Sequence, residues 1–424
     1  MSLSFLRART SLIQKGLALW MLIIVCGMTT ADAAASRSNS LGLPKAGNKA
    51  VFSLLTADPG KEVWSHYGHT GIRYIDSETG TDIVFNYGLF DFSSSNFIIR
   101  FVKGETDYMV GTTSFFNFML EYQIENRTVT EQVLNLTAEE KNRLLGALLT
   151  NIQPKNRYYR YNFLYKNCAT MPRDLIEQAV DGRVEYTLAP PFTSFRDEIH
   201  HFTAVSPWTQ FGIDLALGAP ADKKASLRDQ QFAPDVLMRS FTTAFIKSDS
   251  LSRPLVVSTN KIYRMDPHAE VSTSSLPNPR WVFWAVCFLT LVLTLLEFRL
   301  TSSRWLTGLT SVWDGLLFGA GGLVGCLMYF LLFASVHPTV DVNYLAIWLH
   351  PVHLLFALAL VFRPFRRKIA CLYKAINLPF VLFALCGLLF LPQKLHPALI
   401  PVLFSFLIRS VQGAVVTYKT YRHA

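Results

Sequence analysis

The sequence predicts an α+β domain followed by an all-α bundle of about five transmembrane helices. Up to about residue 280, apolar segments alternate with charges, prolines and turn residues, as in a globular domain. Beyond that point, long apolar runs alternate with short basic loops, as in a membrane protein. Within the first part, predicted strands come before predicted helices, which is typical of an α+β fold.

Residues 1–33 have the pattern of a cleaved signal peptide. Three basic residues precede an apolar run at 16–28, and Ala31-Asp32-Ala33 fits a small-x-small cleavage site. Because the run is short for a spanning segment, an uncleaved anchor helix is the weaker alternative. We therefore predict that residues 34–280 form a domain outside the cytoplasmic membrane, with a linker within 220–280.

The soluble domain is predicted to begin with a small sheet. Strand patterns occur at residues 51–56, 70–75 and 82–87, with turn residues between them. Further along, Thr137 and Glu140 form a capping-box pattern ahead of leucines at helical spacing, which predicts a helix there.

The last part, residues 281–424, is predicted to span the membrane several times. The candidate spans are residues 281–298, 313–334, 344–362, 376–391 and 397–408. With the N-terminal domain outside, the loops assigned to the cytoplasm hold many lysines and arginines, and the outer loops hold only Lys394. The net charge of +10 therefore reflects membrane topology and does not indicate nucleic-acid binding. Four polar residues cluster near the outer face, namely His337, Asn343, His350 and His353.

Cys168 is the sole cysteine between the signal sequence and the membrane region. An unpaired thiol in an oxidising compartment is a liability unless it is buried or used. A helix pattern starts just after it, and the positive end of a helix dipole favours a thiolate. Cys168 is therefore a candidate nucleophile, and a buried, inert cysteine is the alternative.

A cysteine nucleophile needs a base, and the domain offers five histidines: His66, His69, His200, His201 and His268. His69 is favoured because a glycine precedes it and a strand follows it, which places the imidazole at an open sheet edge; His66 is the weaker candidate. Asn86, on the following strand, could orient the imidazole, or could simply cap the turn before Gly88.

Two arginines are candidates for anion binding. Arg73 shares a strand face with His69, and Arg173 lies in the first turn after Cys168. The aromatic-rich stretch at residues 90–122 is core or an acyl-chain cleft, and core is the more common case. No metal, nucleotide or nucleic-acid motif occurs, so no cofactor is expected.

The order of four motifs resembles the Lnb-type lipoprotein N-acyltransferases. The motifs are GHTGIRY at 68–74, VFNYGLF at 84–90, LNLTAEE at 134–140 and YNFLYKNCATMPRDLIE at 161–177. The C-terminal region is similar to that family in layout. The family looks like a permuted relative of papain-like cysteine peptidases, with histidine before cysteine in the chain. The resemblance implies that Cys168 is the nucleophile, His69 the base and Asn86, less securely, the third residue.

The resemblance also implies an activity and a location. A fatty acyl chain would pass from a membrane phospholipid through a Cys168 thioester to the N-terminal amine of a lipoprotein, without a cofactor. The protein would lie in the inner membrane with its N-terminal domain in the periplasm. The alternatives are a Cys–His hydrolase of cell-wall peptides or lipid esters, and a non-enzymatic assembly or sensor module with a buried thiol.

Overall fold

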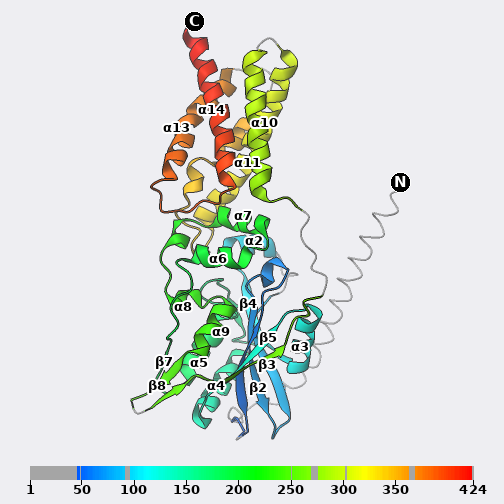
Figure 1. Cartoon of the computed structure of the whole chain (residues 1–424), viewed down its shortest axis with the longest axis vertical. Helices are drawn as coiled ribbons and strands as arrows, with labels where there is room; N and C mark the ends of the chain where they lie inside the picture. Colours follow the sequence, from blue (N-terminus) through cyan, green and yellow to red (C-terminus); the bar gives the residue numbers. More distant parts are fainter. Residues whose placement is uncertain are drawn as a thin grey trace, which may run out of the picture. The chain divides into compact units, whose positions relative to one another are not determined.

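The computed structural model describes residues 45–47, 49–90, 96–249, 251–268, 276–300, 303–361 and 368–422. The predicted signal peptide lies outside these residues. Residues 46–424 form one compact unit, which holds a sheet domain followed by a helical region (Figure 1). The predicted order, an α+β domain and then a helical bundle, is confirmed.

A seven-stranded sheet forms the centre of the first part, in the order β10-β5-β1-β2-β3-β4-β6, with every neighbouring pair antiparallel. Its strands are β1 (Val51–Ala57), β2 (His69–Asp76), β3 (Thr81–Leu89), β4 (Asp107–Ser114), β5 (Val129–Leu134), β6 (Tyr158–Arg160) and β10 (Val256–Tyr263). The three strands predicted from the sequence are β1, β2 and β3, and the structure confirms all three.

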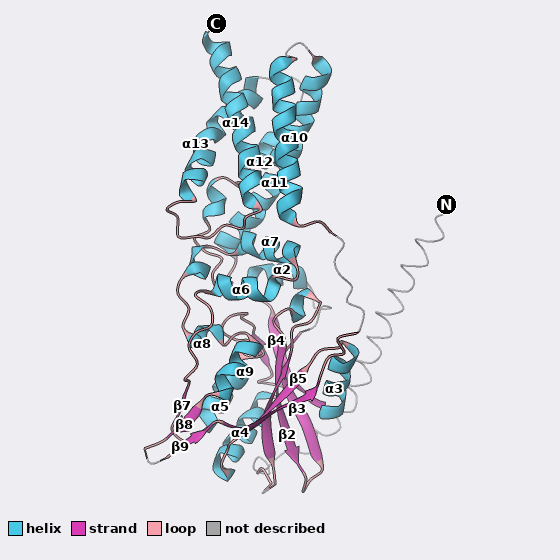
Figure 2. Cartoon of the chain, in the orientation of Figure 1, coloured by secondary structure: helices cyan, strands magenta, loops and turns pink. Residues whose placement is uncertain are grey.

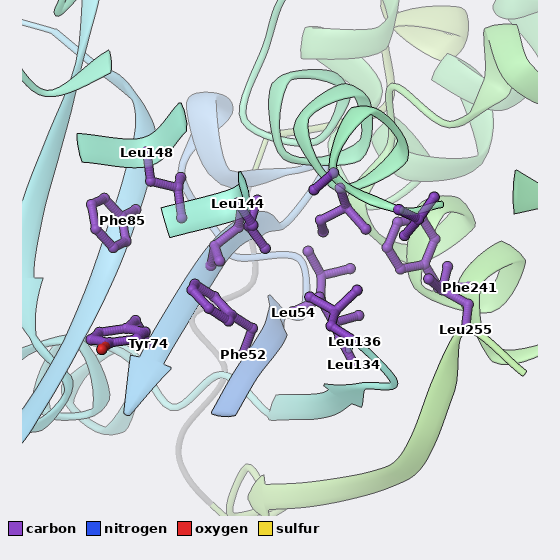
Figure 3. Close-up of a cluster of buried hydrophobic side chains, with 14 of the residues drawn as sticks. Phe52, Leu54, Tyr74, Phe85, Leu134, Leu136, Leu144, Leu148, Phe241 and Leu255 are labelled. Atoms are coloured by element: carbon purple, nitrogen blue, oxygen red, sulfur yellow. The ribbon is translucent and has the colours of Figure 1, made fainter. Parts of the chain in front are cut away.

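Helices cover both faces of this sheet (Figure 2). On one face, Phe52 and Leu54 pack against α4 (Ala138–Asn151), α5 (Thr170–Ala179) and α9 (Pro234–Thr242), as Figure 3 shows in part. On the other face, α3 (Phe115–Ile124) packs against β3 and β4. Burial on both faces explains why β1 is apolar along most of its length. The predicted capping box of α4 is present, with Glu140 Oε2 accepting from the Thr137 N–H at 2.7 Å.

The predicted linker at residues 220–280 is wrong for most of its length. Residues 219–263 hold η2 (Ala219–Asp222), α8 (Leu227–Gln230), α9 and β8 to β10. Strand β10 pairs with β5, and β8 (Phe245–Lys247) joins β7 (Arg183–Glu185) and β9 (Ser252–Pro254) in a second, small sheet. Polar residues are frequent here because β10 is an edge strand with an alternating exposed face.

The remaining helices of the first part lie between β1 and β2, between β3 and β4, and after β7. They are η1 (Val63–Ser65), α2 (Phe97–Lys103), α6 (Phe195–Thr203) and α7 (Pro207–Ala216). Buried aromatic residues from this region, among them Phe195, Phe202 and Phe232, form a separate core cluster.

Four described helices of the second part are long and apolar enough to cross a membrane. They are α10 (Pro279–Arg299), α11 (Arg304–Ala334), α13 (Lys368–Gly387) and α14 (Leu399–Arg422). The third of the five predicted spans is instead a turn, η3 (Tyr344–Ile347), and a short helix, α12 (Val352–Ala359). His350 and Pro351 interrupt this segment, and proline cannot donate a helical hydrogen bond.

Charged side chains inside the bundle are paired with one another. Asp314 on α11 accepts from Lys374 on α13 and from Arg409 on α14, each at 2.8 Å, and Arg409 also bonds to Glu297 on α10 at 2.9 Å. Burying a charge in a membrane is costly unless it is paired. These four residues therefore link four helices.

The polar residues predicted to cluster at the outer face do not form one group. His337 Nε2 lies 2.6 Å from the carbonyl oxygen of Phe101 on α2, and the Asn343 amide donates to the Leu215 carbonyl at the end of α7 at 2.9 Å. The rings of His350 and His353 stack at 4.0 Å within the bundle. His337 and Asn343 thus connect the helical region to the sheet domain.

Candidate active site

Cys168 lies in the turn just before α5, held there by the buried side chain of Asn167. The Asn167 side-chain oxygen accepts from the backbone N–H groups of Ala169 and Thr170, both at 2.9 Å, and its amide donates to the Phe232 carbonyl at 2.8 Å. The predicted helix after Cys168 is confirmed, and it begins two residues later, at Thr170. Asn167 thus caps the helix and fixes the backbone that carries the thiol.

The thiol faces the start of β2 and a bare glycine of β3. The backbone N–H of Thr70, the residue after His69, hydrogen-bonds to the Cys168 sulfur. Gly88 has φ of +90°, and a Cβ at that position would lie 3.6 Å from Cys168 Cβ. The positive φ favours glycine at this position. Cys168 is half-buried as a result.

His69 and Asn86 lie on neighbouring strands at hydrogen-bond distance. His69 Nε2 is 3.2 Å from Asn86 Oδ1, and in the β2–β3 register Asn86 stands opposite Gly71. A Cβ at Gly71 would lie 3.2 Å from Asn86 Oδ1, so glycine leaves room for this pair. Because Oδ1 can only accept, Nε2 carries the proton and the lone pair of neutral His69 is at Nδ1.

Burial keeps both the imidazole and the thiol neutral. Desolvation lowers the pKa of His69 to about 4, against a smaller raising effect of the Asn86 hydrogen bond. Desolvation raises the pKa of Cys168 to about 11, and the hydrogen bond from Thr70 only partly offsets this. At neutral pH the thiol is therefore protonated and the imidazole is an uncharged base.

Arg127 is a charged neighbour that the sequence did not single out. It is buried just before β5, and its positive charge lowers the pKa of both Cys168 and His69. Its guanidinium lies 4.8 Å from the ring centre of Tyr122, and that ring stacks on His69 at 6.4 Å. Arg127 Nε donates to the Asp58 carbonyl at 2.7 Å, which holds the side chain at this end of the sheet. A single arginine ahead of a strand carries no motif, so sequence alone could not find it.

The other histidines of the domain have separate settings. His66 is buried and its Nδ1 lies 3.3 Å from the Gly60 carbonyl oxygen, within its own loop. His200 bonds to Asp214 at 2.8 Å, and His201 contacts Phe192. Among the predicted histidines, His69 is the one whose ring lies at hydrogen-bond distance from Asn86. The next residue along β2, Thr70, is the one whose backbone N–H bonds to the Cys168 sulfur.

The two predicted anion-binding arginines are engaged within the protein. Arg73 bonds to Asp82 at 2.7 Å and to Glu131 at 3.0 Å. Arg173 is buried and bonds to Asp174 at 2.8 Å and to the Arg228 carbonyl at 2.9 Å. Acidic side chains of the protein therefore already compensate both charges. The described residues contain no group of three or more His, Cys, Asp or Glu side chains that could hold a metal ion.

Two family models match the chain, one for each part of the fold. The Lnb N-terminal periplasmic domain matches residues 46–200, and the Lnb transmembrane domain matches residues 271–421. The chain belongs to the Lnb family. The Lnb periplasmic match contains Cys168, His69, Asn86 and Arg127, and it places the sheet domain in the periplasm. No curated protein and no solved structure matches the chain.

The pKa values of the Lnb site predict a broad pH profile. If Cys168 is a nucleophile and His69 its base, kcat/KM with a non-ionising soluble ester should rise as His69 loses its proton near pH 4 and then stay level up to the pKa of Cys168 near 11. The measurement is the rate of Cys168 acylation between pH 5 and 10. A bell-shaped profile with both limbs between pH 6 and 8 would contradict the neutral pair.

Proposed function

We propose that the chain is a membrane-tethered cysteine acyltransferase that moves a fatty acyl chain from a phospholipid to the N-terminal amine of a lipoprotein. One observation carries the proposal. The half-buried thiol of Cys168 contacts the backbone of Thr70, and the imidazole of the preceding residue, His69, is hydrogen-bonded to Asn86. Membership in the Lnb family and four apolar helices support a substrate embedded in the membrane.

In the first half of the reaction, Cys168 takes the acyl group. His69 Nδ1 accepts the thiol proton while the sulfur attacks the ester carbonyl carbon of the phospholipid. The bond between that carbon and the ester oxygen then breaks. The departing lysophospholipid alcohol takes the proton from His69, which leaves a thioester on Cys168 and a neutral imidazole.

In the second half, the amine takes the acyl group. The neutral N-terminal amine of the lipoprotein attacks the thioester carbon, and the carbon–sulfur bond breaks as the amide forms. His69 accepts a proton from the amine nitrogen and returns it to the sulfur, which restores the starting thiol. Atoms and charges balance without a cofactor.

Asn86 and Arg127 are proposed to support these proton transfers. Asn86 holds the tautomer that presents Nδ1, and its carbonyl stabilises the imidazolium that forms during each step. The positive charge of Arg127 favours the thiolate as it develops. The same charge destabilises the imidazolium of His69. The net effect of Arg127 on the rate therefore depends on whether its guanidinium lies closer to the Cys168 sulfur or to the His69 ring.

The tether fits such a reaction. Both the proposed donor and the proposed acceptor are anchored in the outer leaflet, so anchoring the enzyme there raises their effective concentration near the thiol. A hydrolase of cell-wall peptides would be served by a single membrane anchor or by none.

The test is an acyl-transfer assay in vesicles. The full-length protein is mixed with phospholipid vesicles and a synthetic diacylated lipopeptide, and the lipopeptide is analysed by mass spectrometry. The proposal expects a gain of one acyl chain on the lipopeptide amine and an equal amount of lysophospholipid. Release of free fatty acid, with no change in the lipopeptide, would indicate a lipid hydrolase instead.

A further inference from the structure

Helix α7 of the periplasmic domain packs its apolar side chains on the transmembrane bundle. Phe211 and Leu215 contact the apolar core that α11 to α14 share with η3. The ring of Phe211 lies 5.1 Å from that of Phe283 on α10 and 5.4 Å from that of His396, in the loop before α14. The domain is therefore docked on the bundle through an apolar contact, in addition to the chain that joins the two covalently.

Backbone hydrogen bonds continue this contact just after α7. The N–H of Gly218 donates to the Thr339 carbonyl at 2.7 Å, and the N–H of Ala219 donates to the Val342 carbonyl at 3.1 Å. Both acceptors lie in the loop that follows α11, on the periplasmic side of the bundle. Gly218 and Ala219 are buried, so separating the two parts would leave paired backbone groups without their partners.

Two amide side chains of the bundle extend the junction to the end of α7. Asn343 donates to the Leu215 carbonyl at 2.9 Å, and Gln393 donates to the Leu217 carbonyl at 3.0 Å. Gln393 also donates to Asn343 Oδ1 at 3.0 Å, which links the two bundle loops with each other. The bundle thus provides donors for carbonyls at the end of α7, where a helix has none of its own to offer.

Arg196 on α6 holds the same segment from the side of the sheet domain. Its buried guanidinium donates to Asp214 at 2.6 Å and to Asp222 at 2.9 Å. It also donates to the carbonyls of Leu217 and Gly218, each at 3.1 Å. Because hydrogen bonds from a charged donor are stronger than neutral ones, Arg196 fixes the segment between α7 and η2 to the domain.

The junction is connected to the turn that carries the thiol. Phe195, next to Arg196 on α6, packs on Phe232 with ring centres 5.9 Å apart. The Phe232 carbonyl accepts from Asn167 at 2.8 Å, and Asn167 holds the backbone around Cys168. All three linking side chains are buried, and closely packed interiors transmit displacements. The position of the docked segment therefore determines that of Cys168.

We propose that this junction fixes the height and orientation of Cys168 relative to the outer leaflet, so that the bundle positions the thiol on membrane phospholipid. Gly218 and Asn343 are its positioning residues. Residues 264–278 join the two parts covalently and would keep the domain near the membrane without the junction. Fixed geometry accelerates a reaction beyond nearness alone, because the reacting atoms must approach to about 3–3.5 Å in one orientation. The inference rests on the proposed function for its substrate, whereas the docking itself does not.

The test compares two glycines near the junction. A Cβ at Gly218 would overlap the Asp341 carbonyl oxygen in the loop after α11, so Gly218→Ala has to shift the docked segment. The φ of Gly218 is −86°, which alanine adopts without strain. A Cβ at Gly212, on α7, would meet nothing within 4 Å, which makes Gly212→Ala the matched control. Each full-length variant is placed in vesicles of phosphatidylethanolamine and phosphatidylglycerol, with or without a water-soluble butanoyl thioester. Intact mass distinguishes the two acyl groups on Cys168.

Gly218→Ala is expected to slow acylation by the vesicle phospholipid about tenfold or more, since a displaced thiol no longer meets the ester in a productive orientation. Its acylation by the soluble thioester should match wild type, because this donor reaches the thiol from solution. Gly212→Ala should match wild type with both donors. Asn343→Asp removes the N–H that bonds to Leu215 and keeps the oxygen that accepts from Gln393. It should slow only the phospholipid reaction, as Gly218→Ala does.

A wild-type rate for Gly218→Ala and Asn343→Asp with the vesicle phospholipid would overturn the proposal, because the covalent connection would then suffice. Equal slowing with both donors would also overturn it, since that would indicate damage to the site itself. If neither donor acylates the wild-type protein, the proposed function fails, and hydrogen exchange in the same vesicles tests the junction. Residues 217–222 and 339–345 should exchange slowly in wild type and Gly212→Ala and faster in Gly218→Ala. Equal exchange in all three proteins would refute the junction.

Discussion

Replacement of Cys168 by alanine is expected to lower the rate of acyl transfer by roughly 10⁴-fold or more, the scale on which loss of a nucleophile usually acts. The acyl group passes through a bond to the Cys168 sulfur, so no other group of the site can form the intermediate. The half-buried side chain is small, and Asn167 keeps the surrounding backbone in place through its own hydrogen bonds. The protein should therefore stay folded, and the measurement is acylated lipopeptide formed per unit time.

Cys326 provides the matched control. It is a free, exposed cysteine on α11, outside the sheet domain. Cys326→Ser should retain full activity, and its melting temperature should match that of Cys168→Ala. Full activity in Cys168→Ala or in Cys168→Ser would end the nucleophile hypothesis and would leave the assembly or sensor module as the better reading.

Replacement of His69 by alanine is expected to cost about 10²- to 10⁴-fold, the usual contribution of a general base. At neutral pH the thiol is protonated, because its pKa is raised to about 11, so attack depends on a neighbouring group that takes the proton. His69 is neutral above its lowered pKa of about 4 and is therefore ready to act as that base. The ratio of the wild-type rate to the His69→Ala rate should become smaller as the pH approaches the pKa of Cys168, because the thiol then loses its proton to hydroxide without help from a base.

His66 lies three residues away and serves as the control for His69. Its Nδ1 lies 3.3 Å from the Gly60 carbonyl oxygen in its own loop. His66→Ala should therefore keep most of the activity, with any defect appearing in the melting temperature. If His66→Ala lost more activity than His69→Ala, the assignment of the base would have to be reversed.

The sequence predicted the parts of the fold that local patterns encode. Strands β1 to β3 lie where runs of strand-forming residues between turn residues predicted them, and α4 begins at a capping box whose two hydrogen bonds are both present. The division into a sheet domain and a helical bundle followed from composition. Strand β10 was missed because an edge strand buries only some of its side chains, so that its sequence looks like a polar linker.

From the sequence, only those residues of the candidate site that belong to motifs could be predicted. Cys168 and His69 stood out as a lone cysteine and a glycine-flanked histidine, and Asn86 followed from the expected hairpin between β2 and β3. Arg127 reaches this end of the sheet from the start of β5, through a stack on Tyr122 that no spacing encodes. The two arginines predicted to bind anions lie in the motifs, but acidic side chains compensate both. Glu131 on β5 pairs with Arg73, and the adjacent Asp174 pairs with Arg173.

The measurement that tests the central claim most directly is the intact mass of the purified protein after incubation with phospholipid vesicles. The account predicts a mass increase equal to one fatty acyl chain, located on Cys168 by peptide mapping and lost when a diacylated lipopeptide is added. Protein whose mass never changes, under conditions in which the lipopeptide nevertheless gains an acyl chain, would contradict a thioester on Cys168.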